Sequence, residues 1–173
     1  MLDPRPLRRR VHLFLALTIL AIVLVAISIP LAILKGTLPP DIAQHVSAGE
    51  ASLWHRIAIG LAGALPAVAA IWTLTRVLTF LDLYGRGLSL TVESATTMRA
   101  IGCGLFGIVA AQIIARPLQS LVASALNPVG ERSLVISFQG ADLGLILAAG
   151  LVILIAQAIA EAASNRDELN AIV

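Results

Sequence analysis

The chain has 173 residues, of which 58% are apolar and only 13% are charged, and its mean hydropathy is +0.94. In soluble domains about a quarter of all residues are charged. This composition therefore excludes an ordinary soluble domain and indicates an integral membrane protein. The net charge of +2 gives no surface for direct nucleic-acid binding. The single cysteine, Cys103, excludes an internal disulfide and paired-thiol chemistry.

Four stretches without Asp, Glu, Lys or Arg are long enough, or nearly so, to cross a hydrocarbon core that needs about 20 helical residues. They run from Val11 to Leu34, Ile57 to Thr75, Ala100 to Ala115 and Leu143 to Ala160. We therefore expect an all-α integral membrane protein with one domain, a bundle of four transmembrane helices over residues 11–34, 56–76, 100–120 and 142–161. The first stretch exceeds a signal-peptide core of about 7 to 15 residues, so we expect it to stay as an anchor.

Basic residues are divided unequally between the two sides of this expected membrane. Those on the side of the termini are Arg5, Arg8, Arg9, Arg10, Arg76, Arg86, Arg99 and Arg166, and those on the other side are Lys35, Arg56, Arg116 and Arg132. Because positive residues favour the cytoplasmic side, both termini are expected in the cytoplasm.

The connection between the second and third spans has the most patterned polar sequence. Gly85 and Gly87 indicate a turn. Thr91 is expected to cap a helix whose first turn carries Glu93, where the helix dipole favours an anion. This helix should run directly into the third span.

The outer end of the third span carries a polar stripe, since Gln112, Arg116 and Ser120 follow one another at intervals of four residues. We expect Arg116 to lie about one helical turn below the surface and to extend its side chain to water. Asp142, at the start of the fourth span, is expected to contact Arg116. The pair would either fix helix depth and register or sense a ligand. Pro117 is expected to bend the helix where it leaves the membrane.

Small residues predict how the last two spans pack. They recur at every fourth position, at Cys103, Gly107, Ala111 and Ala115 in the third span and at Gly140, Gly144 and Ala148 in the fourth. Such stripes let two helices approach closely in lipid, so we expect spans three and four to be antiparallel neighbours. The sequence SLVISF between them allows one short strand, although a lone strand is unstable.

The inner end of the fourth span is acidic, with Glu161 followed by Asp167 and Glu168. These acids either form ion pairs with arginines of the inner connection or make a solvated helix end. The histidines, His12, His45 and His55, have no metal-ligand spacing, and no catalytic motif is present. We therefore expect no enzyme, metal site or cofactor.

Two stretches carry a family resemblance. They are YGRGLSLTVESATTMRAIG (Tyr84 to Gly102) and ADLGLILAAGLVILIAQAIAEAASNRDELNAIV (Ala141 to Val173). Together they resemble a family of small bacterial four-helix membrane proteins catalogued as a domain of unknown function. Leu90 stands where that family usually has an aromatic residue, and Ser94 where it often has Asn.

Members of that family are commonly encoded beside a small helix-turn-helix regulator of the Cro/cI type. The resemblance implies a protein of the bacterial inner membrane that binds and controls such a regulator by membrane sequestration or signal relay. We expect the contact surface to comprise Tyr84, Gly85, Arg86, Gly87, Glu93, Arg99, Glu161 and Glu168. The lipid bilayer is the other expected partner.

Two other functions stay open. A small transporter or ion-conducting subunit would need a charged residue near the middle of the bilayer, and spans one, two and four have none there. A structural subunit of a larger membrane complex makes no such demand. The sequence also leaves homo-oligomerisation open.

Overall fold

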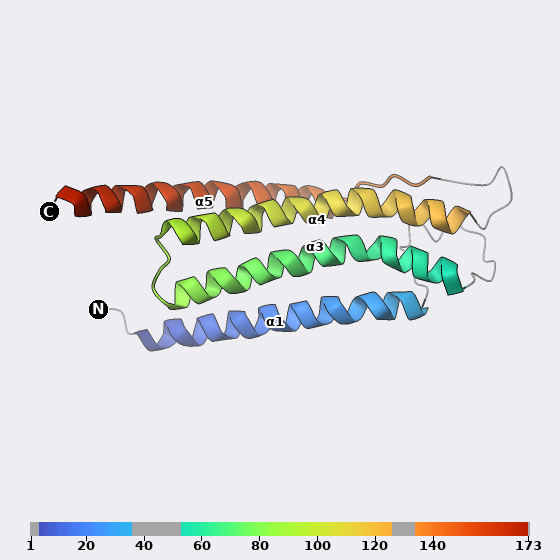
Figure 1. Ribbon diagram of the computed structural model, residues 1–173, viewed down its shortest axis with the longest axis horizontal. Helices are drawn as coiled ribbons and strands as arrows, with labels where there is room; N and C mark the ends of the chain where they lie inside the picture. The colour runs from blue at the N-terminus through green and yellow to red at the C-terminus, as the bar shows by residue number, and fades with distance from the viewer. Residues whose placement is uncertain (1–3, 36–52, 126–133, 173) are drawn as a thin grey trace.

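A computed structural model describes residues 4–35, 53–125 and 134–172, and this part of the chain forms four long helices (Figure 1). They are α1 (Pro4–Lys35), α3 (Leu53–Gly85), α4 (Val92–Ser124) and α5 (Gly140–Ile172). Each contains a stretch that is long and apolar enough to cross a membrane. The expected all-α protein with four such helices is confirmed.

The helices are longer than the spans expected from the sequence. The 33 residues of α3 rise about 50 Å along the helix axis, whereas a hydrocarbon core is about 30 Å thick. On α3, Arg56 and Arg76 bracket the charge-free stretch and are about 30 Å apart along the axis. The charge-free stretches therefore mark the part of each helix that suits lipid, and the helices continue beyond it.

The helices alternate in direction and pack in chain order, α1 against α3, α3 against α4 and α4 against α5 (Figure 1). Among the described residues, no close backbone contact joins α1 to α4 or α5, or α3 to α5. The central helix α4 carries most of the buried residues, whereas no described side chain of α1 is buried. We call the end where α1 begins and α5 ends the inner end, and the opposite end the outer end (Figure 1).

Small residues let α4 approach both of its neighbours. A Cβ atom built on Gly104 would collide with the hydroxyl of Thr73 on α3. A Cβ built on Gly102 would lie 3.1 Å from the carbonyl oxygen of Ala149 on α5, which is tighter than an ordinary contact. Helices in lipid associate through such close packing, so these two glycines fix the position of α4.

The prediction that α4 and α5 pack through a stripe of small residues at every fourth position is wrong at the glycines of that stripe. A Cβ built on Gly107 or Gly144 would meet no atom within 4 Å, and Cys103 is exposed. Ala111 and Ala148 are half-buried. The contact runs instead through positions seven residues apart, a spacing that the four-residue pattern did not capture.

This seven-residue spacing defines the seam between α4 and α5. On α5 it includes the buried residues Asp142, Ala149, Ala156 and Ala163, and on α4 it includes Ala95, Gly102, Val109 and Arg116. An interval of seven keeps one face of a helix against its partner over many turns. The two helices are therefore packed along most of their length, with small side chains and one pair of charges in the seam.

Local hydrogen bonds shape the connection between α3 and α4. Gly87 has a φ of +78°, and the N–H of Leu88 donates to the carbonyl oxygen of Leu83 at 3.0 Å. This is the Schellman arrangement that commonly ends a helix. Thr91 then caps α4, because its hydroxyl oxygen accepts a hydrogen bond from the N–H of Ser94 at 3.2 Å. The expected turn and cap are confirmed.

Residues 134–139, which connect to α5, run beside the outer end of α4 (Figure 1). The N–H of Val135 donates to the hydroxyl of Ser120 at 3.0 Å, and the carbonyl oxygen of Ser137 accepts from Arg116. The side chains of Leu134, Ile136 and Phe138 are exposed. The short strand that this sequence allowed does not form within the described chain, because these backbone groups bond to side chains of α4.

Candidate functional site

At the outer end of the seam between α4 and α5, the structure brings Gln112, Arg116 and Asp142 into one hydrogen-bonded network. Nη1 of Arg116 lies 2.8 Å from Oδ2 of Asp142 and donates to the carbonyl oxygen of Ser137 at 2.7 Å. Nη2 donates at 3.4 Å both to Oε1 of Gln112 and to Oδ1 of Asp142. We refer to these residues as the outer charge cluster.

Asp142 also shapes the start of α5. Its Oδ2 accepts a hydrogen bond from the backbone N–H of Gln139 at 2.8 Å. Gln139 directly precedes α5, and Asp142 is the third residue of the helix. Its side chain accepts a hydrogen bond from the backbone of the cap residue, as the acidic residue of a capping box does. One carboxylate therefore caps α5 and neutralises Arg116.

The outer charge cluster is buried at Asp142 and partly buried at Arg116 and Gln112. The side chain of Asp142 is 1% exposed and that of Arg116 is 11% exposed. Beyond Arg116, α4 passes through Pro117 without ending there and continues to Ser124, about 12 Å further. The expectation that Arg116 reaches water is therefore wrong, because its guanidinium turns toward α5 and uses its donors inside the protein.

The cluster can select one register between the two helices. Elsewhere the seam contains small apolar residues at repeated intervals, which alone would tolerate a shift of seven residues. Such a shift would place Arg116 opposite Ala149 and leave the carboxylate of Asp142 buried without its partner. Because an unpaired buried charge is costly, the cluster favours the observed register.

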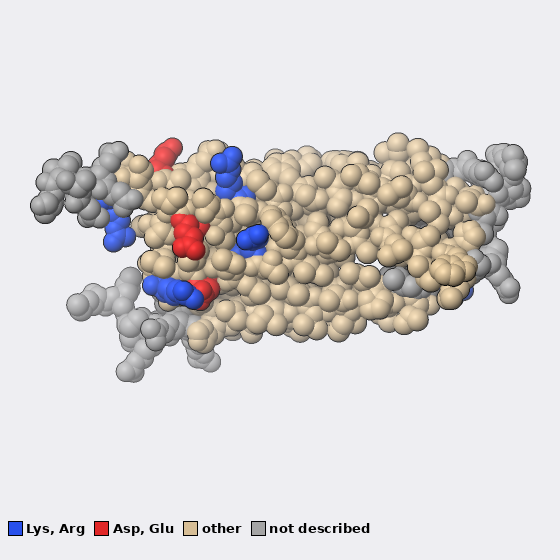
Figure 2. All heavy atoms as spheres, in the orientation of Figure 1, with Lys and Arg blue, Asp and Glu red and all other residues tan. Residues whose placement is uncertain are grey.

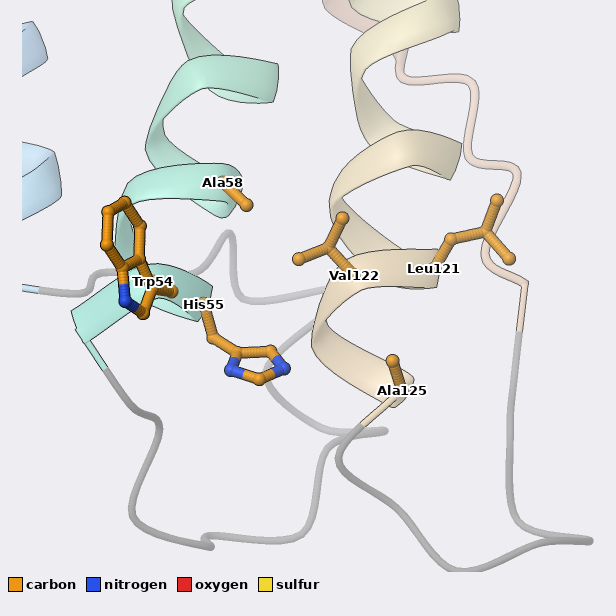
Figure 3. Close-up of a pocket in the computed structure, with 6 residues that line it drawn as sticks. All are labelled: Trp54, His55, Ala58, Leu121, Val122 and Ala125. Atoms are coloured by element: carbon orange, nitrogen blue, oxygen red, sulfur yellow. The ribbon is translucent and has the colours of Figure 1, made fainter.

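A pocket of about 450 Å³ lies between α3 and α4 at the outer end (Figure 3). Its lining residues are Trp54, His55, Ala58, Leu121, Val122 and Ala125. In Figure 3 the imidazole of His55 extends into the space between the two helices, and Ala58 and Val122 face each other across it. Nowhere in the described chain is a group of three His, Cys, Asp or Glu side chains placed to hold a metal ion.

The inner end carries the other group of residues selected from the sequence. Figure 2 shows charged side chains gathered at this end, while the middle of the same face is free of them. Seven of the selected residues are exposed there: Tyr84, Gly85, Arg86, Gly87, Glu93, Arg99 and Glu161. We call this set the inner surface. The side chains of Asp167 and Glu168, together with His45 and Arg132, lie outside the described residues.

Most charges of the inner surface face water without a charged partner. Arg86 forms an ion pair with Asp82 at 2.7 Å, a residue that the sequence reasoning missed although it lies one helical turn earlier. Within the described chain, no ion pair joins Glu93 or Glu161 to an arginine. This favours a solvated end of α5 over the salt-bridged alternative.

Comparison of the chain with known proteins adds no relative to this description: no family model, curated protein or solved structure matches it.

Proposed function

We propose that this chain is a multi-pass protein of the bacterial inner membrane whose inner surface binds a cytoplasmic helix-turn-helix regulator. In this proposal both termini are cytoplasmic, and binding holds the regulator at the membrane or relays a signal to it. The identity of the regulator rests on the family resemblance of the sequence. The proposal that the partner is a protein in water rests on the exposed charges of the inner surface.

The inner surface is the observation that carries the proposal. It includes residues from the end of α3, from the connection between α3 and α4, from α4 and from α5, and it contains both Arg99 and Glu161 as exposed charges. Exposed charges of both signs suit recognition of a complementary protein surface, since they select partners and speed their encounter. A lipid-facing surface would not favour these residues.

The distribution of basic residues supports a cytoplasmic position for the inner end. Arg76, Arg86, Arg99 and Arg166 all lie on the side of the termini. At the outer end, the described arginines are Arg56, which is exposed, and Arg116, which is mostly buried and paired with Asp142. An excess of arginine in the connections and tails favours the cytoplasmic side of a membrane.

One helix links the two ends in this proposal. The helix α4 contributes Glu93 and Arg99 to the inner surface and Arg116 to the outer charge cluster. A change at the outer end that shifts α4 against α5 would therefore move residues of the inner surface. In this proposal α4 is the element that relays a signal from the outer end to the inner end.

Co-purification from native membranes tests the proposal, with two variants that make the same charge change at opposite ends. We expect the tagged wild-type chain to recover a helix-turn-helix protein, Arg86→Glu to lose most of it, and Arg56→Glu to retain it. Both arginines are exposed, so neither change disturbs a buried contact. Recovery of membrane subunits alone from the wild type would contradict the proposal and favour a structural subunit.

A further inference from the structure

A second pocket, of about 280 Å³, lies at the inner end between α1 and α3. It sits where the apolar stretch of α1 begins, at Val11, and where α3 ends, at Gly85. The two helices are close there, since a Cβ built on Gly85 would lie 3.6 Å from Cγ1 of Val11. The pocket is therefore at the boundary between the apolar part of the helices and water.

The pocket has an apolar part and a polar rim. Val11 and Leu15 of α1 and Leu81 of α3 supply its apolar side chains. His12, Asp82, Tyr84 and Arg86 supply its polar side chains, and Asp82 and Arg86 are the acidic and basic groups at the rim. An apolar base joined to a charged mouth, on the membrane boundary of two helices, suits an amphipathic lipid better than a wholly polar solute.

The charges of the rim come as a pair. Nη2 of Arg86 lies 2.7 Å from Oδ2 of Asp82, and the two side chains are 66% and 54% exposed. An ion pair with this exposure contributes little to stability, so a ligand can rearrange it at little cost. A guanidinium binds phosphate through parallel hydrogen bonds, and a carboxylate accepts hydrogen bonds from an ammonium group.

We propose that this pocket binds a zwitterionic phospholipid with a primary amine in its headgroup, namely phosphatidylethanolamine. Arg86 contacts the phosphate, Asp82 accepts a hydrogen bond from the ammonium, and one acyl chain lies against Val11, Leu15 and Leu81. A headgroup with one positive and one negative group matches the neutral pair, whereas a purely anionic headgroup leaves Asp82 opposed to it. A quaternary ammonium gives Asp82 no N–H donor.

Lipid retention on the purified full chain, measured by native mass spectrometry, tests this assignment. The chain is exchanged into detergent with equal amounts of phosphatidylethanolamine, phosphatidylcholine and phosphatidylglycerol. We expect the wild type to retain phosphatidylethanolamine at least tenfold over each of the other two. Asp82→Asn should strongly reduce the preference for phosphatidylethanolamine over phosphatidylcholine, because a neutral amide makes a weaker hydrogen bond to the ammonium than a carboxylate does.

A pair of matched substitutions tests the position of the site. Gly85→Phe places a ring in the pocket and is expected to reduce phosphatidylethanolamine retention at least tenfold. Gly107→Phe makes the same change on an open surface of α4, where a Cβ meets no atom within 4 Å, and should keep wild-type retention. The helix content of both variants is checked by circular dichroism, and Asp82→Asn provides a test that does not alter packing.

Three outcomes would overturn the inference: equal retention of phosphatidylethanolamine and phosphatidylcholine by the wild type, best retention of phosphatidylglycerol, or equal retention by Gly85→Phe and Gly107→Phe. The experiment contains no regulator protein. Its result is therefore independent of the function proposed above.

Discussion

Arg116 and Asp142 lie in a seam of otherwise small or apolar side chains, and each is the other's charged partner. Removing one of them leaves the other charge with hydrogen bonds to neighbouring polar groups but without a counter-charge. Removing both leaves a smaller defect, because no uncompensated charge remains. The pair is therefore expected to matter more for register and folding than for ligand binding.

We predict that Arg116→Leu lowers the free energy of unfolding by about 3 kcal/mol and that the double variant with Asp142→Leu lowers it by less. The measurement is an SDS unfolding titration in mixed micelles, followed by circular dichroism. Arg56→Leu, at an exposed position, serves as control and should change the midpoint little. An Arg116→Leu protein as stable as the control would show that the pair has no structural role.

Gly104 and Gly107 offer a second test on single residues. Gly104 faces the side chain of Thr73, whereas Gly107 has open space where a Cβ would stand. We predict that Gly104→Val destabilises the protein by about 1 to 3 kcal/mol through overpacking, while Gly107→Val has a small effect. The same SDS titration measures both. Equal effects would mean that α3 and α4 do not approach each other closely at Gly104.

Among the helices and connections, the junction of α3 and α4 depends most on one backbone conformation. Gly87 has a positive φ, which costs other residues about 1 kcal/mol, whereas Gly85 belongs to the regular part of α3. We predict that Gly87→Ala lowers the free energy of unfolding by about 1 kcal/mol and that Gly85→Ala does not. Thermal unfolding of the two variants in one detergent checks this, and a stable Gly87→Ala protein would contradict it.

The sequence predicts the elements well where one local property determines them. Charge-free stretches locate the four helices, and Thr91 and Gly87 locate a cap and a turn, because each acts within a few residues of its own position. Helix ends are less well predicted, since α4 passes Pro117 and reaches Ser124. Lack of charge identifies the part of a helix that suits lipid and contains no signal for the end of the helix.

Contacts between helices are predicted less well. The meeting of Arg116 and Asp142 follows from their similar depth in neighbouring antiparallel helices. The close approach at Gly102 does not follow from a four-residue pattern, although the spacing of seven from Asp142 through Ala149 to Ala156 is visible in the sequence. The inner pocket had no sequence signal, because α1 and α3 contribute residues about seventy positions apart.

At the scale of the whole molecule, the packing of helices in chain order makes α1 and α5 the edges and places α3 and α4 between them. The start of α1 and the end of α5 then lie at the same end of the bundle, and the connection between α3 and α4 lies with them (Figure 1). The orientation proposed here places that end in the cytoplasm.

Single-cysteine labelling tests this orientation. In a Cys103→Ser background, Leu90→Cys marks the inner end and Ile136→Cys marks the outer end, and both side chains are exposed. With a membrane-impermeant maleimide, we predict labelling of Ile136→Cys in spheroplasts and of Leu90→Cys only in inverted vesicles. The opposite pattern would place the inner end outside the cell.

Site-specific photo-crosslinking in living cells tests the binding of a cytoplasmic regulator most directly. A photoreactive amino acid replaces Tyr84 or Glu161 on the inner surface, and Trp54 at the outer end serves as control; all three side chains are exposed. We predict that both inner positions crosslink to a soluble helix-turn-helix protein and that the control does not. Crosslinks from the inner positions only to membrane proteins, or none at all, would contradict the proposed function.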